Sequence, residues 1–233
     1  MKPVLALPSS LGTTAELWDP NARHWAGAFS LLRYDQRGRN SIDQLGADLL
    51  ELLDEHGFER VSVCGLSLGG ATAMWVAANA PERVDRLVLA CTSARFGDPE
   101  HWLERAAIVR ERGLDPIADG IVARWFTPAA PPEVVGRFRQ MLVETPRESY
   151  AACCEALARW DFRRRLPEIA APTLVIAAAQ DQATPLEDSD VLARGIPGAR
   201  LVVVADAAHL ANVEQAEAFS KLVTEHLAPV EVA

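Results

Sequence analysis

A serine between glycines follows a short apolar run in the first third of the chain. Residues 65–69, GLSLG, match the pattern G-x-S-x-G, and a helical pattern begins directly after Ser67. At such a strand-to-helix junction the turn exposes the serine hydroxyl and directs a helix N-terminus toward it, where negative charge is favoured. The pattern is short and common, but its place at this junction predicts that Ser67 is a nucleophile.

A serine nucleophile needs a base to remove its proton, and the base needs a carboxylate to fix its tautomer. Of the five histidines, His209 follows the last predicted strand, at the sheet edge where Ser67 is expected. Asp181 ends another predicted strand at that edge. Asp206 and Asp98 are alternatives to Asp181, although Asp206, three residues before His209, fits better as a residue that shapes the loop.

A tetrahedral intermediate also requires backbone N–H donors aimed at its oxyanion. One donor is expected from Leu68, directly after the nucleophile, and the other from the loop PSSLGTT at 8–14. Within that loop we assign the second donor to Leu11, from its position seven residues before Trp18 in the sequence.

The elements that must position these residues alternate along the chain. Six apolar runs without strict alternation predict buried parallel strands, at 3–8, 29–34, 60–64, 83–91, 172–179 and 199–205. Amphipathic or capped patterns between them predict helices, among them 42–58, 68–80 and 212–227. The chain is therefore predicted to be an α/β protein with a doubly wound, mostly parallel sheet.

The alternation stops between residues 97 and 165, where helical patterns continue without a strand. We expect residues 97–165 to form a helical lid inserted in a core made of 1–96 and 166–233. This insertion holds 11 Arg and 11 Asp or Glu, so the rest of the chain carries the whole net charge of −9. Its arginines could admit an anionic ligand, or they could belong to solvated helix faces with pairs four residues apart.

The composition is that of a globular protein of 233 residues. The net charge of −9 argues against nucleic acid and anionic membranes as partners, and no apolar run approaches the roughly 20 residues that span a bilayer. The opening MKPVLALPSS predicts a strand rather than a secretion signal. The four cysteines show no metal-ligand spacing, which favours reduced thiols and a cytoplasmic location.

The chain resembles one family of the α/β-hydrolase superfamily, the β-ketoadipate (3-oxoadipate) enol-lactonases. The resemblance covers most of the chain, including the lid, and rests on SSLGTTAELWDP (9–20), RYDQRG (33–38), CGLSLGG (64–70), RWFTP (124–128), TPRESYAACCEALARWD (145–161), AAAQDQATP (177–185) and IPGARLVVVADAAHLANVEQ (196–215). It implies Ser67, Asp181 and His209 as a catalytic triad, with no metal or organic cofactor. Two departures are expected to alter the sheet edge: the chain begins at the family's third strand, without the N-terminal hairpin, and the loop after RYDQRGRNS is shorter.

The expected reaction is hydrolysis of a carboxylate-bearing enol-lactone through an acyl-enzyme. Arg124 is the candidate for binding the carboxylate, with Trp125 and Trp18 as pocket walls. Alternatively, Arg124 is a surface residue, Trp125 packs inside the lid and Trp18 in the core. Two other functions remain open: a carboxylesterase or hydrolase of another lactone or acyl substrate with the same triad, and a ligand-binding or biosynthetic protein that does not hydrolyse.

Overall fold

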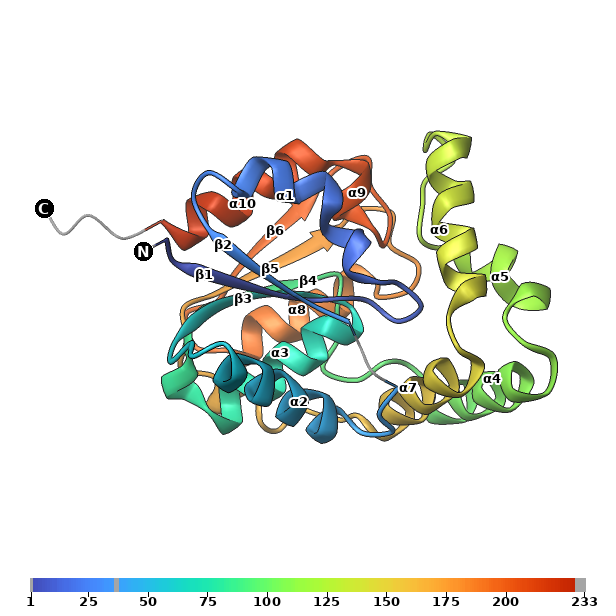
Figure 1. The fold of residues 1–233 in the computed structure, drawn as a ribbon, viewed down its shortest axis with the longest axis horizontal. Helices are drawn as coiled ribbons and strands as arrows, with labels where there is room; N and C mark the ends of the chain where they lie inside the picture. The colour runs from blue at the N-terminus through green and yellow to red at the C-terminus, as the bar shows by residue number, and fades with distance from the viewer. Residues whose placement is uncertain (1, 36–37, 229–233) are drawn as a thin grey trace, which may run out of the picture.

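Six parallel strands form one sheet in the computed structural model, which describes residues 2–35 and 38–228. The strand order is β2-β1-β3-β4-β5-β6, and every neighbouring pair is parallel (Figure 1). The strands are β1 (Val4–Pro8), β2 (Ser30–Tyr34), β3 (Val61–Leu66), β4 (Val84–Ala90), β5 (Thr173–Ala178) and β6 (Arg200–Val204). The prediction of a doubly wound α/β sheet is confirmed, with all strands rather than most of them parallel.

Helices cover both faces of this sheet. Figure 1 shows α1 and α10 on one face and α2, α3 and α8 on the other. Because both faces are covered, β3 and β5 are buried along their whole lengths, which explains their continuous apolar sequences. The helices outside the 97–165 segment are α1 (Asp19–Trp25), α2 (Ile42–Glu55), α3 (Leu68–Asn79), α8 (Leu186–Gly195), α9 (Ala211–Glu214) and α10 (Ala216–Leu227), and 3-10 turns lie at Ala15–Trp18, Pro81–Arg83 and Leu166–Glu168.

The helix predicted at 212–227 is wrong as a single element. It is broken at Gln215, whose φ of −122° and ψ of 50° separate α9 from α10. The side-chain amide of Gln215 donates to the backbone oxygen of Asp206 at 2.9 Å, and the buried Asn212 donates to the backbone oxygen of Leu17 at 2.9 Å. These contacts, to the 3-10 turn at Ala15–Trp18 and to the loop before His209, hold α9 as a separate turn, because a continuous helix would point these side chains in other directions.

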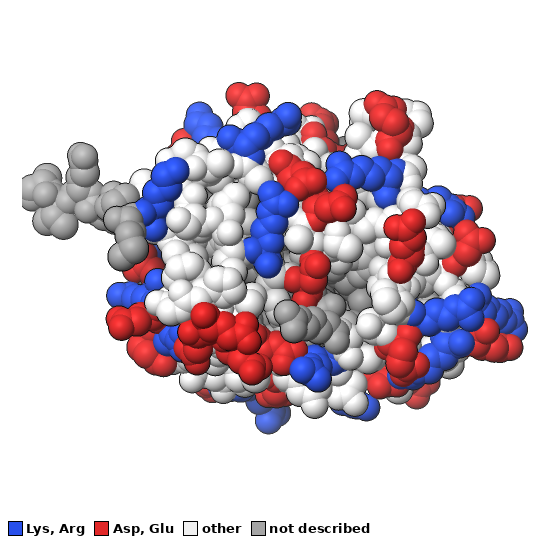
Figure 2. All heavy atoms as spheres, viewed as in Figure 1, with Lys and Arg blue, Asp and Glu red and all other residues white. Residues whose placement is uncertain are grey.

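Four helices occupy the segment between β4 and β5, and all of its residues are described. They are α4 (Pro99–Arg112), α5 (Asp115–Val122), α6 (Pro132–Glu144) and α7 (Arg147–Arg159). Helix α4 packs against α7 and α5 against α6, beyond the carboxyl ends of the strands (Figure 1). A continuous hydrophobic core joins these helices to the sheet. On the face shown in Figure 2, acidic and basic side chains are intermixed over these helices.

The four cysteines are buried and free. Within the described residues, no helix combines the length and apolar character that crossing a membrane requires. Residues 36 and 37 of the RYDQRG motif lie outside the described part of the chain.

Candidate active site

The chain passes from β3 into α3 at Ser67, through a tight turn that requires glycine two residues before and two residues after the serine. Ser67 has a φ of 57° and a ψ of −116°, a left-handed conformation that is strained for a residue with a side chain. A Cβ at Gly65 would collide with the backbone oxygen of Gly69, and a Cβ at Gly69 would collide with that of Pro8. The glycines therefore let α3 start against the ends of β3 and β1, with Ser67 at the tip of the turn.

His209 and Asp181 form a buried pair at the same edge of the sheet. His209 Nδ1 lies 2.8 Å from Asp181 Oδ2, and their side chains are 3% and 0% exposed. The other carboxylate oxygen accepts from the N–H groups of Ala183 at 2.8 Å and Thr184 at 3.0 Å, and the Thr184 hydroxyl donates to Oδ2 at 2.7 Å. Asp181 thus receives hydrogen bonds at both oxygens.

These contacts keep Asp181 ionised and determine which tautomer a neutral His209 adopts. Burial raises the pKa of the Asp181 carboxyl, but His209 and the hydrogen bonds from Thr184 outweigh it and hold the pKa below its usual value. An ionised carboxylate only accepts hydrogen bonds, so the bond to His209 requires the proton on Nδ1. Nε2 of His209 then carries the lone pair that a general base needs.

The two alternative carboxylates do not contact His209. Asp206 is exposed, has a φ of 51°, and uses its backbone oxygen to accept from Gln215. Asp98 caps α4, where its side chain accepts from the N–H of Glu100 at 3.0 Å. Asp206 therefore shapes the loop before His209, and Asp98 shapes the start of a helix.

Ser67 and His209 line one small cavity of about 50 Å³. The structure brings three other predicted site residues, Leu11, Arg124 and Trp125, to the walls of the same cavity. No hydrogen bond between the Ser67 hydroxyl and His209 is formed within the described residues. Catalytic hydrogen bonds are often long without substrate and tighten when it binds. The evidence that the Ser67 hydroxyl and the His209 imidazole face each other is therefore the cavity that both residues line.

The two backbone N–H groups expected to bind an oxyanion have no acceptor in the structure of the described residues. Leu68 is the first residue of α3, and Leu11 lies in the loop after β1. Neither N–H donates to an acceptor within the part of the chain that the structure describes. The N–H of Leu68 also lies at the positive end of the α3 dipole, which favours negative charge.

Trp18 is not brought to this cavity. Its side chain is completely buried and packs against Trp25 and Phe219, with ring centroids 6.1 and 6.4 Å apart. Trp18 is the last residue of the 3-10 turn at Ala15–Trp18, directly before α1, which packs on α10, so its ring faces the core rather than the sheet edge. The structure therefore corrects the expectation of a pocket wall and places Trp18 in the core.

Glu214 is a residue of the site that the sequence analysis missed. One oxygen of its carboxylate accepts from the N–H of Thr127 at 2.8 Å and the hydroxyl of Thr127 at 2.7 Å. The other oxygen accepts from the N–H of Ala208, next to His209, at 2.7 Å. No local pattern could reveal this link because Thr127 lies 87 residues before Glu214. By contrast, Thr184 lies three residues after Asp181, where a turn motif could have indicated it.

The arrangement offers a hydroxyl, an imidazole with an oriented proton, a buried carboxylate and two free N–H donors. Among the described residues, no cluster of three or more His, Cys, Asp or Glu side chains is placed to hold a metal ion. The hydroxyl, imidazole, carboxylate and N–H donors together can transfer an acyl group through a covalent intermediate.

Comparison with known proteins agrees with this fold. The family model described as alpha/beta hydrolase fold matches residues 18–216, and the chain belongs to that family. The chain is 39% identical to 3-oxoadipate enol-lactonase 2 of Acinetobacter baylyi, over 95% of this chain and 87% of that protein. It is 31% identical to 3-oxoadipate enol-lactonase 1 of the same organism, over 94% and 86%. The crystal structure of the enol-lactonase from Burkholderia xenovorans LB400 superposes with a TM-score of 0.94 at 38% identity, covering 97% of this chain and 92% of that one.

Proposed function

We propose that this α/β hydrolase opens an enol-lactone that carries a free carboxylate, with Ser67 as nucleophile, His209 as base and Asp181 as its partner. The observation that carries the proposal is the buried His209–Asp181 pair on the cavity that Ser67 also lines. The similarity to enol-lactonases over nearly the whole chain supports this substrate class.

The reaction proceeds in two halves. Nε2 of His209 takes the Ser67 proton as Oγ attacks the lactone carbonyl, and the N–H groups of Leu11 and Leu68 bind the oxyanion. Collapse breaks the ring C–O bond and expels an enolate, which takes the proton from His209 and tautomerises to the ketone. A water molecule, deprotonated by His209, then attacks the acyl-enzyme and releases the acid and Ser67.

Residues 97–165 act as a lid in this proposal. The cavity at Ser67 is about 50 Å³, whereas pockets for small ligands are usually about 300 Å³ or more. Because α5 and α7 contribute Ile121 and Tyr150 to its wall, we expect the helices of the lid to shift when substrate enters. Arg124 and Trp125 border the cavity from the lid, where the arginine can bind the substrate carboxylate.

The test is hydrolysis of the carboxymethyl-substituted enol-lactone by purified protein, followed by loss of its ultraviolet absorption. Ser67→Ala and Asp181→Asn should each lower kcat by about 10³-fold or more while the protein remains folded. Faster turnover of an uncharged aryl ester than of the lactone would favour the carboxylesterase alternative. Equal labelling of wild type and Ser67→Ala by a serine-directed phosphonate would favour a protein that does not hydrolyse.

A further inference from the structure

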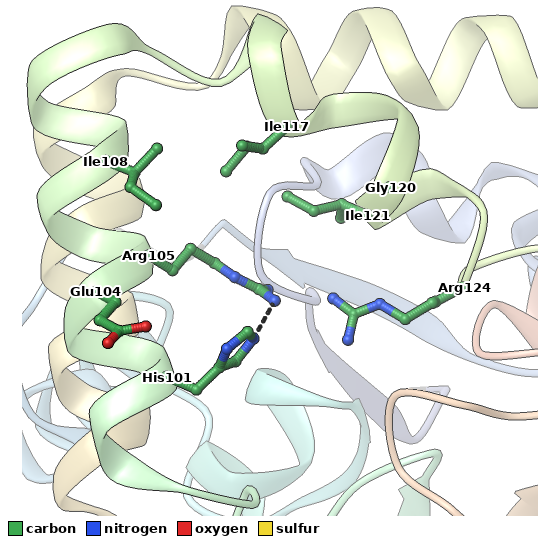
Figure 3. A pocket seen from close by; sticks show the side chains of 8 residues that line it. All are labelled: His101, Glu104, Arg105, Ile108, Ile117, Gly120, Ile121 and Arg124. Atoms are coloured by element: carbon green, nitrogen blue, oxygen red, sulfur yellow. Dashed lines mark hydrogen bonds between the residues drawn. The ribbon is translucent and has the colours of Figure 1, made fainter.

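Two arginines border a second cavity, of about 270 Å³, between α4 and α5. Arg105 projects from α4, and Arg124 projects toward it from the segment after α5 (Figure 3). Ile108, Ile117 and Ile121 supply apolar parts of the wall, and His101 and the carboxylate of Glu104 also border the space. The two guanidinium groups therefore face a space that can hold part of a ligand.

Neither of these arginines forms an ion pair with a carboxylate of the described residues. Neighbouring arginines of the lid do: Arg110 pairs with Glu148 at 2.7 Å, and Arg139 with Asp119 at 2.6 Å. Arg110 and Arg139 are thus neutralised within the lid, whereas Arg105 and Arg124 keep their charges available for an added anion.

The pair is also unfavourable without an anion. Arg124 is half-buried, and burial together with the charge of Arg105 lowers the pKa of its guanidinium. Two like charges that are partly removed from water repel each other more strongly than they would in bulk solvent. An anion bound between them would relieve this repulsion.

Arg105 is held in place by its own helix. Its Nη2 donates to His101 Nε2 at 2.9 Å, one turn earlier on α4, as the dashed line in Figure 3 shows. Its guanidinium carbon lies 4.7 Å from the centroid of the Trp102 ring, within the range of a cation–π interaction. These contacts orient the guanidinium and leave other N–H groups for a ligand, because arginine has five donors.

The arginine pair lies where this second cavity meets the cavity of Ser67. Arg105, Ile121 and Arg124 line both spaces. A ligand with its scissile carbonyl at Ser67 can therefore extend a carboxylate toward the two guanidinium groups.

We propose that Arg105, oriented by His101 and Trp102, completes a carboxylate subsite with Arg124, and that this subsite makes the enzyme specific for anionic lactones. The inference rests on the proposed function and adds a second cation to it. Guanidinium groups bind carboxylates in bidentate geometry, so two of them fix both the position and the plane of the carboxylate. Ring opening of a lactone leaves both halves joined, so the same subsite holds the acyl-enzyme until water attacks.

The test compares the enol-lactone acid with its methyl ester, which keeps the scissile bond and loses the charge. In Arg105→Gln the ratio of kcat/KM for the acid to kcat/KM for the methyl ester should fall about 10- to 100-fold, mainly through KM for the acid. Arg105→Lys keeps the charge without the planar fork and should fall between wild type and Arg105→Gln. Arg112→Gln removes an exposed arginine of the same helix and should leave the ratio unchanged.

A binding measurement tests the subsite without depending on turnover. Adipate is a dicarboxylate without a scissile bond, and its affinity can be measured by calorimetric titration. It should bind wild type and Arg112→Gln with equal affinity and Arg105→Gln at least about tenfold more weakly. Equal ratios and equal adipate binding in wild type and Arg105→Gln would overturn the subsite and leave the proposed reaction standing. Adipate binding that depends on Arg105, in a protein that opens neither lactone, would support the subsite and reject the reaction.

Discussion

Replacing Glu214 by glutamine tests whether one carboxylate holds the loop before His209 and the segment after α5 together. Glu214 accepts two hydrogen bonds from Thr127, three residues after Arg124, and one from Ala208, directly before His209. Glutamine has nearly the same shape, but it offers one oxygen where glutamate offers two. Whichever way the amide turns, its NH₂ group faces a backbone N–H that formerly had an acceptor.

The size of the effect follows from these three bonds. A hydrogen bond to a charged acceptor contributes about 1.5–3 kcal/mol, and a donor left without an acceptor adds a desolvation cost when buried. Thr127 and Ala208 are 9% and 3% exposed, but Glu214 itself is partly exposed, so water compensates for part of the loss. We expect Glu214→Gln to lower the free energy of unfolding by about 2 kcal/mol, which corresponds to a fall in Tm of about 4–8 °C for a chain of this size.

The loss of activity should exceed the loss of folded protein. Because Ala208 precedes His209, a looser loop misplaces the imidazole, and small displacements at a reacting group are costly. We expect kcat/KM for the lactone to fall about 10- to 100-fold at a temperature where the variant is fully folded. Urea unfolding and steady-state kinetics measure the two effects. Glu217→Gln is the control, since Glu217 is exposed near the start of α10.

A double-mutant cycle with Thr127→Val distinguishes a specific link from general destabilisation. Valine removes the hydroxyl bond to Glu214 and keeps the N–H bond. If the two residues act through that contact, the combined loss should be smaller than the sum of the single losses by about 0.5–1.5 kcal/mol. Additive losses, or a Glu214→Gln variant that matches Glu217→Gln in stability and kcat/KM, would refute the reasoning.

Two further substitutions test the turn at Ser67 and the half-buried carboxyl of Asp188. Gly65→Ala places a Cβ against the backbone oxygen of Gly69 and should lower the free energy of unfolding by about 3 kcal/mol and remove most of the activity. Gly136→Ala in α6 has open space around its Cβ and should leave activity unchanged and stability unchanged or higher. Circular dichroism melting and steady-state kinetics measure the two effects. Burial raises the pKa of Asp188 to about 6, so the folded state binds this proton more tightly than the unfolded state and loses stability as pH rises from about 4 to 6. Asp188→Asn should therefore be more stable than wild type by about 1–2 kcal/mol above pH 7 and no more stable at pH 4; a constant difference across this range of unfolding experiments would contradict the assignment.

Part of the site could be predicted because parallel strands order it. Ser67, Asp181 and His209 each follow a strand, and the carboxyl ends of parallel strands meet at one edge of the sheet. The strand boundaries follow from continuous apolar runs, and the expected strands match the observed ones to within two residues at every end. Local rules also predicted the start of α2, where the hydroxyl of Ser41 accepts from the N–H of Gln44 at 3.3 Å.

What the sequence could not predict depends on packing between helices. Trp18 is equally suited to a pocket wall and to a core, and only its contacts with Trp25 and Phe219 decide. Likewise, spacing along α4 predicts that His101 lies beside Arg105, but it says nothing of Arg124 on the facing segment. The approach of α4 to α5 brings those arginines together, and no periodicity within one helix encodes the placement of another.

The break in the helix at Gln215 shows how a local helical pattern gives way to contacts between distant elements. Successive residues of an α-helix turn by about 100°, so an unbroken helix from 212 to 227 would tie the direction of Glu214 to the face that packs on the core. The break frees α9 to turn Glu214 toward Thr127 and Ala208. The regular pattern is therefore interrupted at the residue that connects the loop before His209 to Thr127, as expected where a local preference yields to tertiary contacts.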